Sequence, residues 1–203
     1  DFVKSNISMR EWLFLIPLIV IGIIMAVIYE KIEKVIVWLI KPISDKRMML
    51  AVMTAIVLAG TAFVLLYTLF SGITELQDIL LKWEEMSILT LIIIGIWKLF
   101  LTALCLKTGW WGGHIFPLTF SGVMIGFVFS TIFSLEATIT ATIVTTALLA
   151  YNMKRPAVAA IIVLYFFPSN SLPMMITIFV IFSILGMIIR KKPRRNEEQS
   201  YEN

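Results

Sequence analysis

The sequence predicts an all-α polytopic membrane protein. Of its 203 residues, 60% are hydrophobic and 15% are charged, whereas soluble domains carry about 25% charged residues. Apolar runs recur along the whole chain, and they cover residues 13–29, 48–70, 87–106, 115–133, 137–150, 157–167 and 172–189. Because a full span needs roughly 20 residues, several runs are too short to cross a membrane alone. We therefore expect tilted and half-spanning helices, which favour a transporter or a channel.

The charged residues predict one fixed orientation in the membrane. Basic residues cluster in one connection and in the tail, at Lys31, Lys34, Lys41, Lys46 and Arg47 and at Arg190, Lys191, Lys192, Arg194 and Arg195. Such clusters are cytoplasmic by the positive-inside rule. The connection over residues 70–87 is mainly acidic and is expected on the opposite face. The predicted organisation is a membrane domain over residues 1–189 and a basic, polar cytoplasmic tail over 190–203.

Three further elements are expected in the first half. The first span is predicted to break near Tyr29 into an amphipathic segment over residues 30–40 that lies at the membrane surface. Pro42 ends this segment, and the run from Met48 is long enough to cross with some tilt. After it, a glycine-containing turn and a short amphipathic helix are expected over residues 71–80.

The polar residues of the second half are interpreted mainly as packing residues. Gly122 and Gly126 form a small-xxx-small pair, which lets two helices approach closely. Glu136 is expected to cap a helix start, and Cys105 to be a small core residue. A row of threonines is expected to pack between helices in preference to lining a pore, and its members are Thr138, Thr140, Thr142, Thr145 and Thr146.

Lys98 is an ionisable residue near the middle of an apolar run. Such a residue costs at least about 2.5 kcal/mol in the membrane unless it faces protein or water. We expect Lys98 to point inward, in a functional or structural ion-pair role, or else to snorkel.

A glycine cluster separates two of the apolar runs, with the sequence Lys-Thr-Gly-Trp-Trp-Gly-Gly-His-Ile-Phe-Pro over residues 107–117. Glycines followed by a helix start let successive backbone N–H groups point at one spot, at the positive end of the helix dipole. Inside a bilayer this arrangement attracts anions.

Four segments in this order resemble the second half of the CLC family of chloride channels and proton-coupled chloride exchangers. Gly112, Gly113, Pro117 and Gly122 match the family's G-S-G-x-x-G-G-x-F-x-P-x-x-x-x-G segment. The other matches are to its K-x-x-x-T-A-L run at 98–104, its S-G-x-x-x-I-Q turn at 71–77 and its R-x-P helix at 153–163. The resemblance implies the second inverted-repeat half of a CLC-type fold.

The resemblance also implies a site. In the family, backbone amides between the Gly-Gly pair and the proline bind chloride at mid-membrane, which points to Ile115 and Phe116 here. Gly109, Gly112, Gly113, His114 and Pro117 would form the supporting loop and helix start. The sequence departs from the family pattern at Ile115, where phenylalanine is usual, and at Phe116, where a small residue is usual. These departures put the width of the pore in question.

His114 stands where the family commonly has an aliphatic residue. As a titrating group it could couple anion binding to pH. The favoured interpretation is a neutral, hydrogen-bonded histidine near a helix start. A metal site is not expected, because no second His or Cys ligand lies nearby.

Several family elements have no counterpart in these residues. The Lys192-Pro193 pair resembles the family's K-P before a final helix, but Arg195 stands at the position of a chloride-contacting tyrosine. The family's first half, with its serine and gating-glutamate segments, is also missing. We therefore expect the chain to be the C-terminal half of a CLC-type protein, with the N-terminal half, a second copy in a homodimer, chloride and membrane lipids as its partners. No cofactor and no nucleic acid are expected.

Two alternatives to anion transport remain. One is a small carrier made of two antiparallel copies of this chain, although dual topology needs a more balanced distribution of Lys and Arg. The other is a non-transporting scaffold or assembly subunit whose helices only pack. An enzyme is not expected, since the sequence lacks a Ser/His/Asp set, a His-Glu pair and a phosphate loop with lysine.

Overall fold

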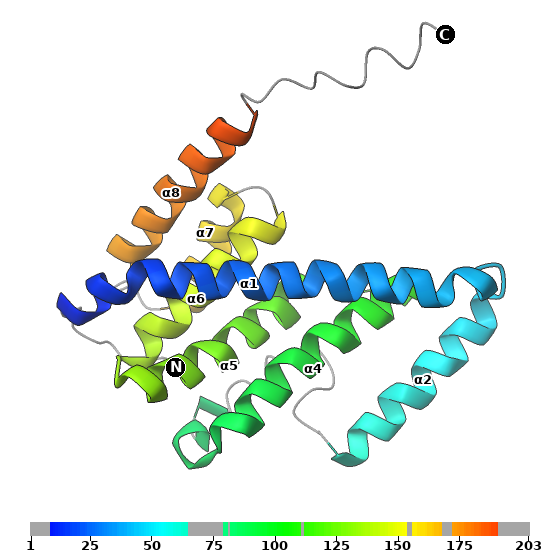
Figure 1. Cartoon of the computed structure of the whole chain (residues 1–203). Coiled ribbons are helices and arrows are strands. Elements are labelled where there is room, and N and C mark those ends of the chain that lie inside the picture. The colour runs from blue at the N-terminus through cyan, green and yellow to red at the C-terminus, as the bar shows by residue number, and fades with distance from the viewer. Residues whose placement is uncertain are drawn as a thin grey trace, which may run out of the picture.

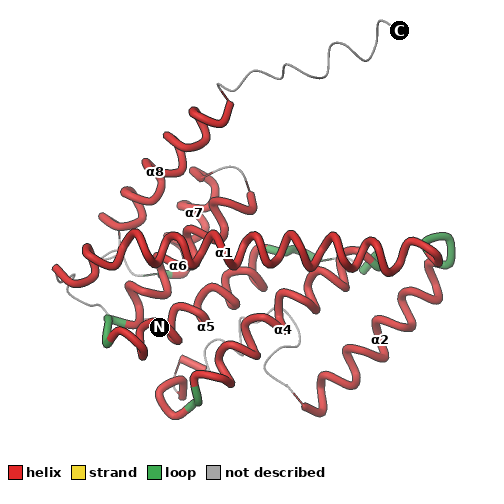
Figure 2. The backbone as a smooth tube through the Cα atoms, viewed as in Figure 1, coloured by secondary structure: helices red, strands yellow, loops and turns green. Residues whose placement is uncertain are grey.

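The computed structural model describes residues 9–64, 79–80, 82–110, 112–153, 156–167 and 172–190. Within these ranges the chain forms helices and short turns without a strand (Figure 2). The α-helices are α1 (Met9–Ile40), α2 (Arg47–Val64), α4 (Ile88–Lys107), α5 (Ile115–Phe133), α6 (Ala137–Met153), α7 (Pro156–Phe166) and α8 (Leu172–Arg190). Two short 3₁₀ turns, η1 (Lys41–Ile43) and η3 (Trp83–Glu85), precede α2 and α4. The all-α prediction is confirmed.

The helices lie where the apolar runs predict them. Helix α5 covers the predicted 115–133 range, and α6, α7 and α8 each begin within one residue of the corresponding run. Three helical segments are long and apolar enough to cross a membrane, namely Trp12–Ile43, Ile88–Lys107 and Ile115–Phe133, whereas the other apolar helices of the described part are shorter. The turn and amphipathic helix expected over 71–80 and the tail from 191 lie outside the described residues, apart from helical residues 79–80.

One expectation for the first helix is wrong. The first span does not break near Tyr29, because α1 is continuous from Met9 to Ile40 and crosses the whole molecule (Figure 1). The charged segment over residues 30–40 continues the same helix, with one face turned toward the bundle. Tyr29 and Ile36 are buried, and Glu33 forms an ion pair with Lys107 at the end of α4.

Helix α6 is the centre of the bundle. It contacts α1, α5, α7 and α8, and every residue from Thr138 to Ala150 is buried. Helices α4 and α5 pack side by side next to it, while α2 turns back from the far end of α1 (Figure 1). A hydrogen bond of 2.9 Å from the Thr54 hydroxyl to the Thr108 hydroxyl joins α2 to the loop after α4.

Small residues let these helices approach closely. A Cβ atom on Gly122 would lie 2.6 Å from the Thr145 hydroxyl oxygen, and one on Gly126 would lie 2.8 Å from the Ala141 backbone nitrogen. Real side chains do not tolerate such distances. The prediction that Gly122 and Gly126 serve close packing is therefore confirmed, and their partner is α6.

The threonines of α6 also serve the interior of the bundle. Thr140, Thr142 and Thr146 donate hydrogen bonds of 2.6–2.8 Å to backbone carbonyls one turn earlier. Their hydroxyls are therefore satisfied within the helix, and all five threonines of the row are buried. This burial agrees with the packing interpretation.

Helix α6 begins at a side-chain cap. The Ile139 amide donates a hydrogen bond of 2.9 Å to the Glu136 Oε2 atom, which confirms the capping role predicted for Glu136. The preceding turn contains Ser134 in the left-handed region, with φ of 51°. The Ser130 hydroxyl stabilises this turn by donating to the Leu135 carbonyl.

Candidate anion site at the start of α5

The loop before α5 begins with a glycine-dependent helix end. Helix α4 ends at Lys107, and Gly109 follows with φ of +91°, a conformation that favours glycine. The Trp110 amide donates a hydrogen bond of 3.0 Å back to the Cys105 carbonyl, as in a Schellman motif. Gly109 therefore turns the chain sharply out of α4 and toward the start of α5. Trp111 lies outside the described residues.

The start of α5 leaves backbone donors without intrahelical acceptors. Helix α5 begins at Ile115, and its first backbone hydrogen bond runs from the Leu118 amide to the His114 carbonyl, at 3.0 Å. The amides of His114, Ile115 and Phe116 precede that bond and have no acceptor within the helix. Pro117 carries no N–H. Three successive donors thus stand at the positive end of the α5 dipole.

No side chain of the described residues accepts a hydrogen bond from these three amides. His114 occupies the N-cap position, and its side chain makes no capping hydrogen bond. Within the described part of the chain, the hydrogen-bonded histidine expected from the sequence is therefore not found in the form of a helix cap. The side chain lies half-buried beside a cavity instead.

The Gly-Gly pair lies in open surroundings. Apart from its two chain neighbours, a Cβ atom added to Gly112 or Gly113 would meet no atom of the described structure within 4 Å, in contrast to Gly122 and Gly126. Packing within the described structure thus does not explain these two glycines. Next to them, Pro117 is buried, whereas Phe116 is 40% exposed and lies edge-on to Phe166 of α7, with 5.5 Å between the ring centroids.

Lys98 lies elsewhere in the bundle. It is 1% exposed, and its Nζ atom lies 5.2 Å from the ring centroid of Phe120 on α5. This distance fits a cation–π contact. Lys98 therefore faces protein and does not snorkel to the surface of the described structure. It does not line the cavity beside His114.

That cavity, of about 480 Å³, was not predicted. Helices α1, α4 and α6 and the N-cap residue of α5 supply its lining residues, which are Tyr29, Glu33, Leu106, Lys107, His114, Asn152 and Met153. Inside it, the Lys107 Nζ atom lies 2.9 Å from the Glu33 Oε1 atom, and Glu33 also accepts a hydrogen bond from the Tyr29 hydroxyl. One sequence feature pointed to this cavity, namely Lys107, the first residue of the glycine cluster. Spacing in the sequence alone does not connect Lys107 with Glu33.

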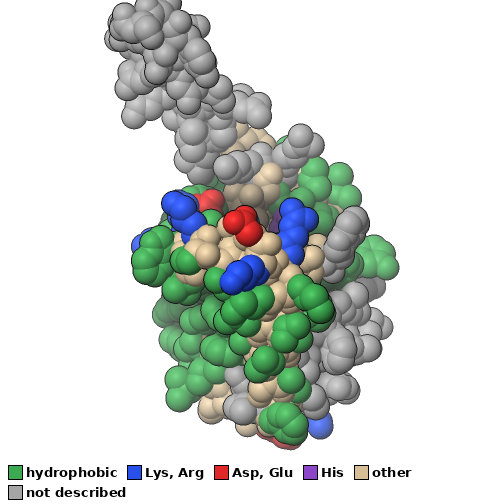
Figure 3. Space-filling view, turned by 90° about the vertical axis from the view of Figure 1, so that its right-hand side faces the viewer, with side chains coloured by type: hydrophobic (Ala, Val, Ile, Leu, Met, Phe, Trp, Pro, Cys, Tyr) green, Lys and Arg blue, Asp and Glu red, His purple; other side chains and the backbone are tan. Residues whose placement is uncertain are grey.

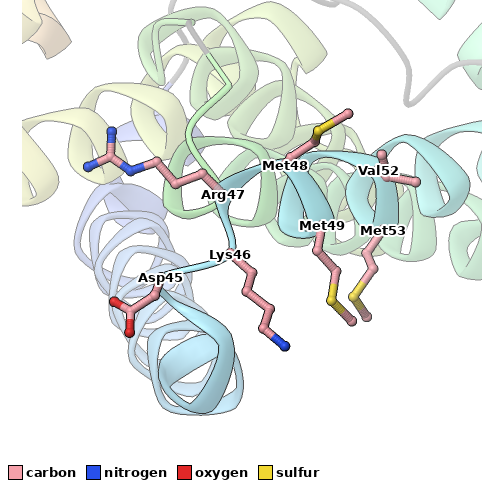
Figure 4. Close-up of a pocket in the computed structure, with 7 residues that line it drawn as sticks. All are labelled: Asp45, Lys46, Arg47, Met48, Met49, Val52 and Met53. Carbon is pink, nitrogen blue, oxygen red and sulfur yellow. The ribbon is translucent and has the colours of Figure 1, made fainter.

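Other cavities lie away from the start of α5. One of about 620 Å³ shares Glu33 and Lys107 with the first and is otherwise lined by Glu30, Lys34, Val37, Trp38 and Lys41. One of about 730 Å³ borders the start of α2, where Lys46, Met49 and Met53 point to one side and Asp45 and Arg47 point away (Figure 4). This last cavity contains none of the predicted site residues.

Charged side chains concentrate at one end of the molecule. Seen from the side where α1 turns into α2, most of the visible acidic and basic side chains gather in a band above a broad hydrophobic flank (Figure 3). Among the described residues, no group of three or more His, Cys, Asp or Glu side chains could hold a metal ion.

These features define an integral membrane protein of CLC-type all-α fold, with helices long and apolar enough to span a bilayer and an open helix start that offers backbone donors. The chain belongs to the voltage gated chloride channel family, whose model matches residues 1–185. A search of curated proteins finds no match. Membership of this family makes chloride transport the general function of the chain.

Proposed function

We propose that the protein carries chloride or a similar anion across the membrane, as a channel or a proton-coupled exchanger, and that the amides of Ile115 and Phe116 bind the anion. The observation that supports this proposal is the uncapped start of α5, which leaves these donors without an intrahelical acceptor. The roles of Gly109, Gly112, Gly113, His114 and Pro117 are to form the loop and helix start that aim the donors at one spot.

Amide donors suit transport because they stabilise a dehydrated anion without a full positive charge. A lysine at the same point would hold the anion too long, whereas amides bind it and still release it. The open space beside Gly112 and Gly113 leaves room for the anion to approach the backbone closely. Lys98, buried one helix away, adds a positive charge that faces into the bundle.

The proposal includes the assembly around the site. The N-terminal half of the same protein supplies the facing part of the anion pathway, since proteins of inverted-repeat design bind ions where the two halves meet. A homodimer forms through α7, where Ile161 and Tyr165 are exposed apolar side chains. The tail beyond Ile189 is cytoplasmic. The protein is a transporter and not an enzyme, and it needs no cofactor.

A proline at Ile115 tests the role of the amides. Ile115 is the first residue of α5, where a helix accepts proline, so Ile115→Pro removes one N–H donor. Proline disfavours the αR conformation that His114 has before it, so thermal melting of the variant is measured beside the efflux to show that the fold is kept. A hydrogen bond to a charged group contributes about 1.5–3 kcal/mol. We therefore expect chloride efflux from liposomes containing the full-length protein to fall about tenfold or more, with each 1.4 kcal/mol giving a factor of ten.

Two controls separate the amide from other effects. Ile115→Leu keeps the N–H and is expected to keep the efflux. Ile88→Pro makes the same chemical change at the first residue of α4, after the extended Ser87, and is also expected to keep the efflux. Equal efflux from Ile115→Pro and the native protein would contradict the assigned site, and a native protein without efflux would favour the scaffold alternative.

A further inference from the structure

The cavity of about 480 Å³ places one cation next to the start of α5. Its wall includes His114, the N-cap residue of α5, and Lys107, the last residue of α4. Lys107 is the one lysine or arginine among the described lining residues. An anion that reaches the α5 amides through this cavity passes this ammonium group.

A chain of polar contacts holds Lys107 in position. Its Nζ atom lies 2.9 Å from Glu33 Oε1 on α1, and the same carboxylate accepts a hydrogen bond from the Tyr29 hydroxyl. Tyr29 is 2% exposed, so this series of polar contacts begins at a residue that is fixed in the core. A lysine ammonium has three N–H donors, and the contact with one carboxylate oxygen leaves donors for another acceptor.

The ion pair also stands between two cavities. Glu33 and Lys107 line both the cavity beside His114 and the neighbouring one of about 620 Å³, which contains Lys34 and Lys41. Their side chains are 25% and 34% exposed, so solvent reaches the pair. The Lys107 charge is therefore available to an anion that arrives from solvent and is partly cancelled by Glu33.

We propose that Lys107, positioned by Glu33 and Tyr29, recruits the anion at the mouth of the α5 site and that Glu33 weakens this attraction enough for the anion to leave. The inference rests on the anion transport proposed above and adds a residue that sets the apparent affinity for chloride. It predicts opposite changes in the apparent KM for chloride when either partner of the ion pair is removed. Removal of the cation weakens recruitment of the anion, and removal of the carboxylate strengthens it.

The test measures initial chloride flux against chloride concentration at constant ionic strength, with the full-length protein in liposomes. Lys107→Met is expected to raise the apparent KM about threefold, and Glu33→Gln to lower it by a similar factor, as suits a partly exposed charge. Lys107→Arg keeps the charge and is expected to restore the native KM. Both shifts should shrink at high salt because screening weakens the attraction.

Control variants make the outcome decisive. Lys31→Met and Glu84→Gln remove exposed charges that do not line the cavity beside His114, and they are expected to leave KM unchanged. If Lys107→Met and Glu33→Gln shift KM in the same direction, or Lys31→Met shifts it as much as Lys107→Met, the ion pair serves only to join α1 to α4 and the inference is wrong. Loss of the Ile115→Pro effect would instead refute the amide site, so the two failures are distinguishable.

Discussion

Helix α5 uses glycine and backbone groups in opposite ways in its middle and at its start. In its middle, Gly122 and Gly126 are pressed against α6, where a Cβ atom would collide with Thr145 and Ala141. Just before its start, Gly112 and Gly113 meet nothing nearby, and the first amides have no acceptor in the helix. The middle of α5 is therefore built for packing, and its start leaves space and donors for a ligand.

Neighbouring helix starts sharpen this contrast. Ser87 accepts a hydrogen bond of 3.1 Å from the Thr90 amide at the start of α4, and Glu136 accepts one from Ile139 at the start of α6. His114 makes no such bond at the start of α5. A helix start in the membrane normally needs an acceptor for its donors. The missing cap at α5 is thus the feature that an anion would complete.

The largest loss of stability is expected in the middle of α5, where it packs against α6. Gly126→Val would force side-chain atoms into the Ala141 backbone, which cannot move without shifting α6, and α6 contacts four other helices. We expect a loss of at least about 3 kcal/mol of stability, the upper end for overpacking. Size-exclusion chromatography and thermal melting in detergent would measure it. A variant that melts like the native protein would show that α5 and α6 are not in this close contact.

Just before the start of α5, we expect a loss of chloride efflux with little loss of stability. Gly113→Ala adds a methyl group where the described structure has space, so melting should stay within about 0.5 kcal/mol of the native value, as for surface substitutions. Chloride efflux should nevertheless fall, because the methyl group occupies the approach to the α5 amides. Melting and efflux measured on the same preparation separate the two effects. If efflux is unchanged, the space beside Gly113 is not part of the anion path.

A modest loss of stability, with no effect on transport, is expected at the capped start of α6. Glu136→Ala removes the acceptor for the Ile139 amide and should cost about 1 kcal/mol, whereas Glu136→Gln keeps an acceptor oxygen and should cost less. Thermal melting would compare the two variants. Neither should change the apparent KM for chloride, since Glu136 is at the far end of α5. A change in KM would mean that the two ends of α5 are coupled.

The sequence predicts the helices well because their signal is local. Apolar runs and their breaks place α5 to the residue, and the small-xxx-small spacing identifies the face of α5 that packs on α6. The continuity of α1 could not be predicted in the same way. Glu33 looks like part of a surface face until Lys107, far away in the sequence, is brought within 2.9 Å of it.

The candidate site was predictable only in part, because some of its residues are close in the sequence and others come together only in the fold. The glycine cluster and the proline indicate where backbone donors become available, since these are properties of consecutive residues. The cavity beside His114 combines residues of three helices with the N-cap residue of α5, and no spacing rule connects Tyr29, Lys107 and Asn152. The surroundings of the site therefore emerge only from packing.

Bromide, which replaces chloride and scatters anomalously, tests the central claim most directly. The measurement is an anomalous difference map of the full-length protein crystallised with bromide. We predict a peak within about 3.5 Å of the backbone nitrogens of Ile115 and Phe116, weakened or lost in Ile115→Pro. A bromide site beside Lys98, with none at the start of α5, would contradict the account.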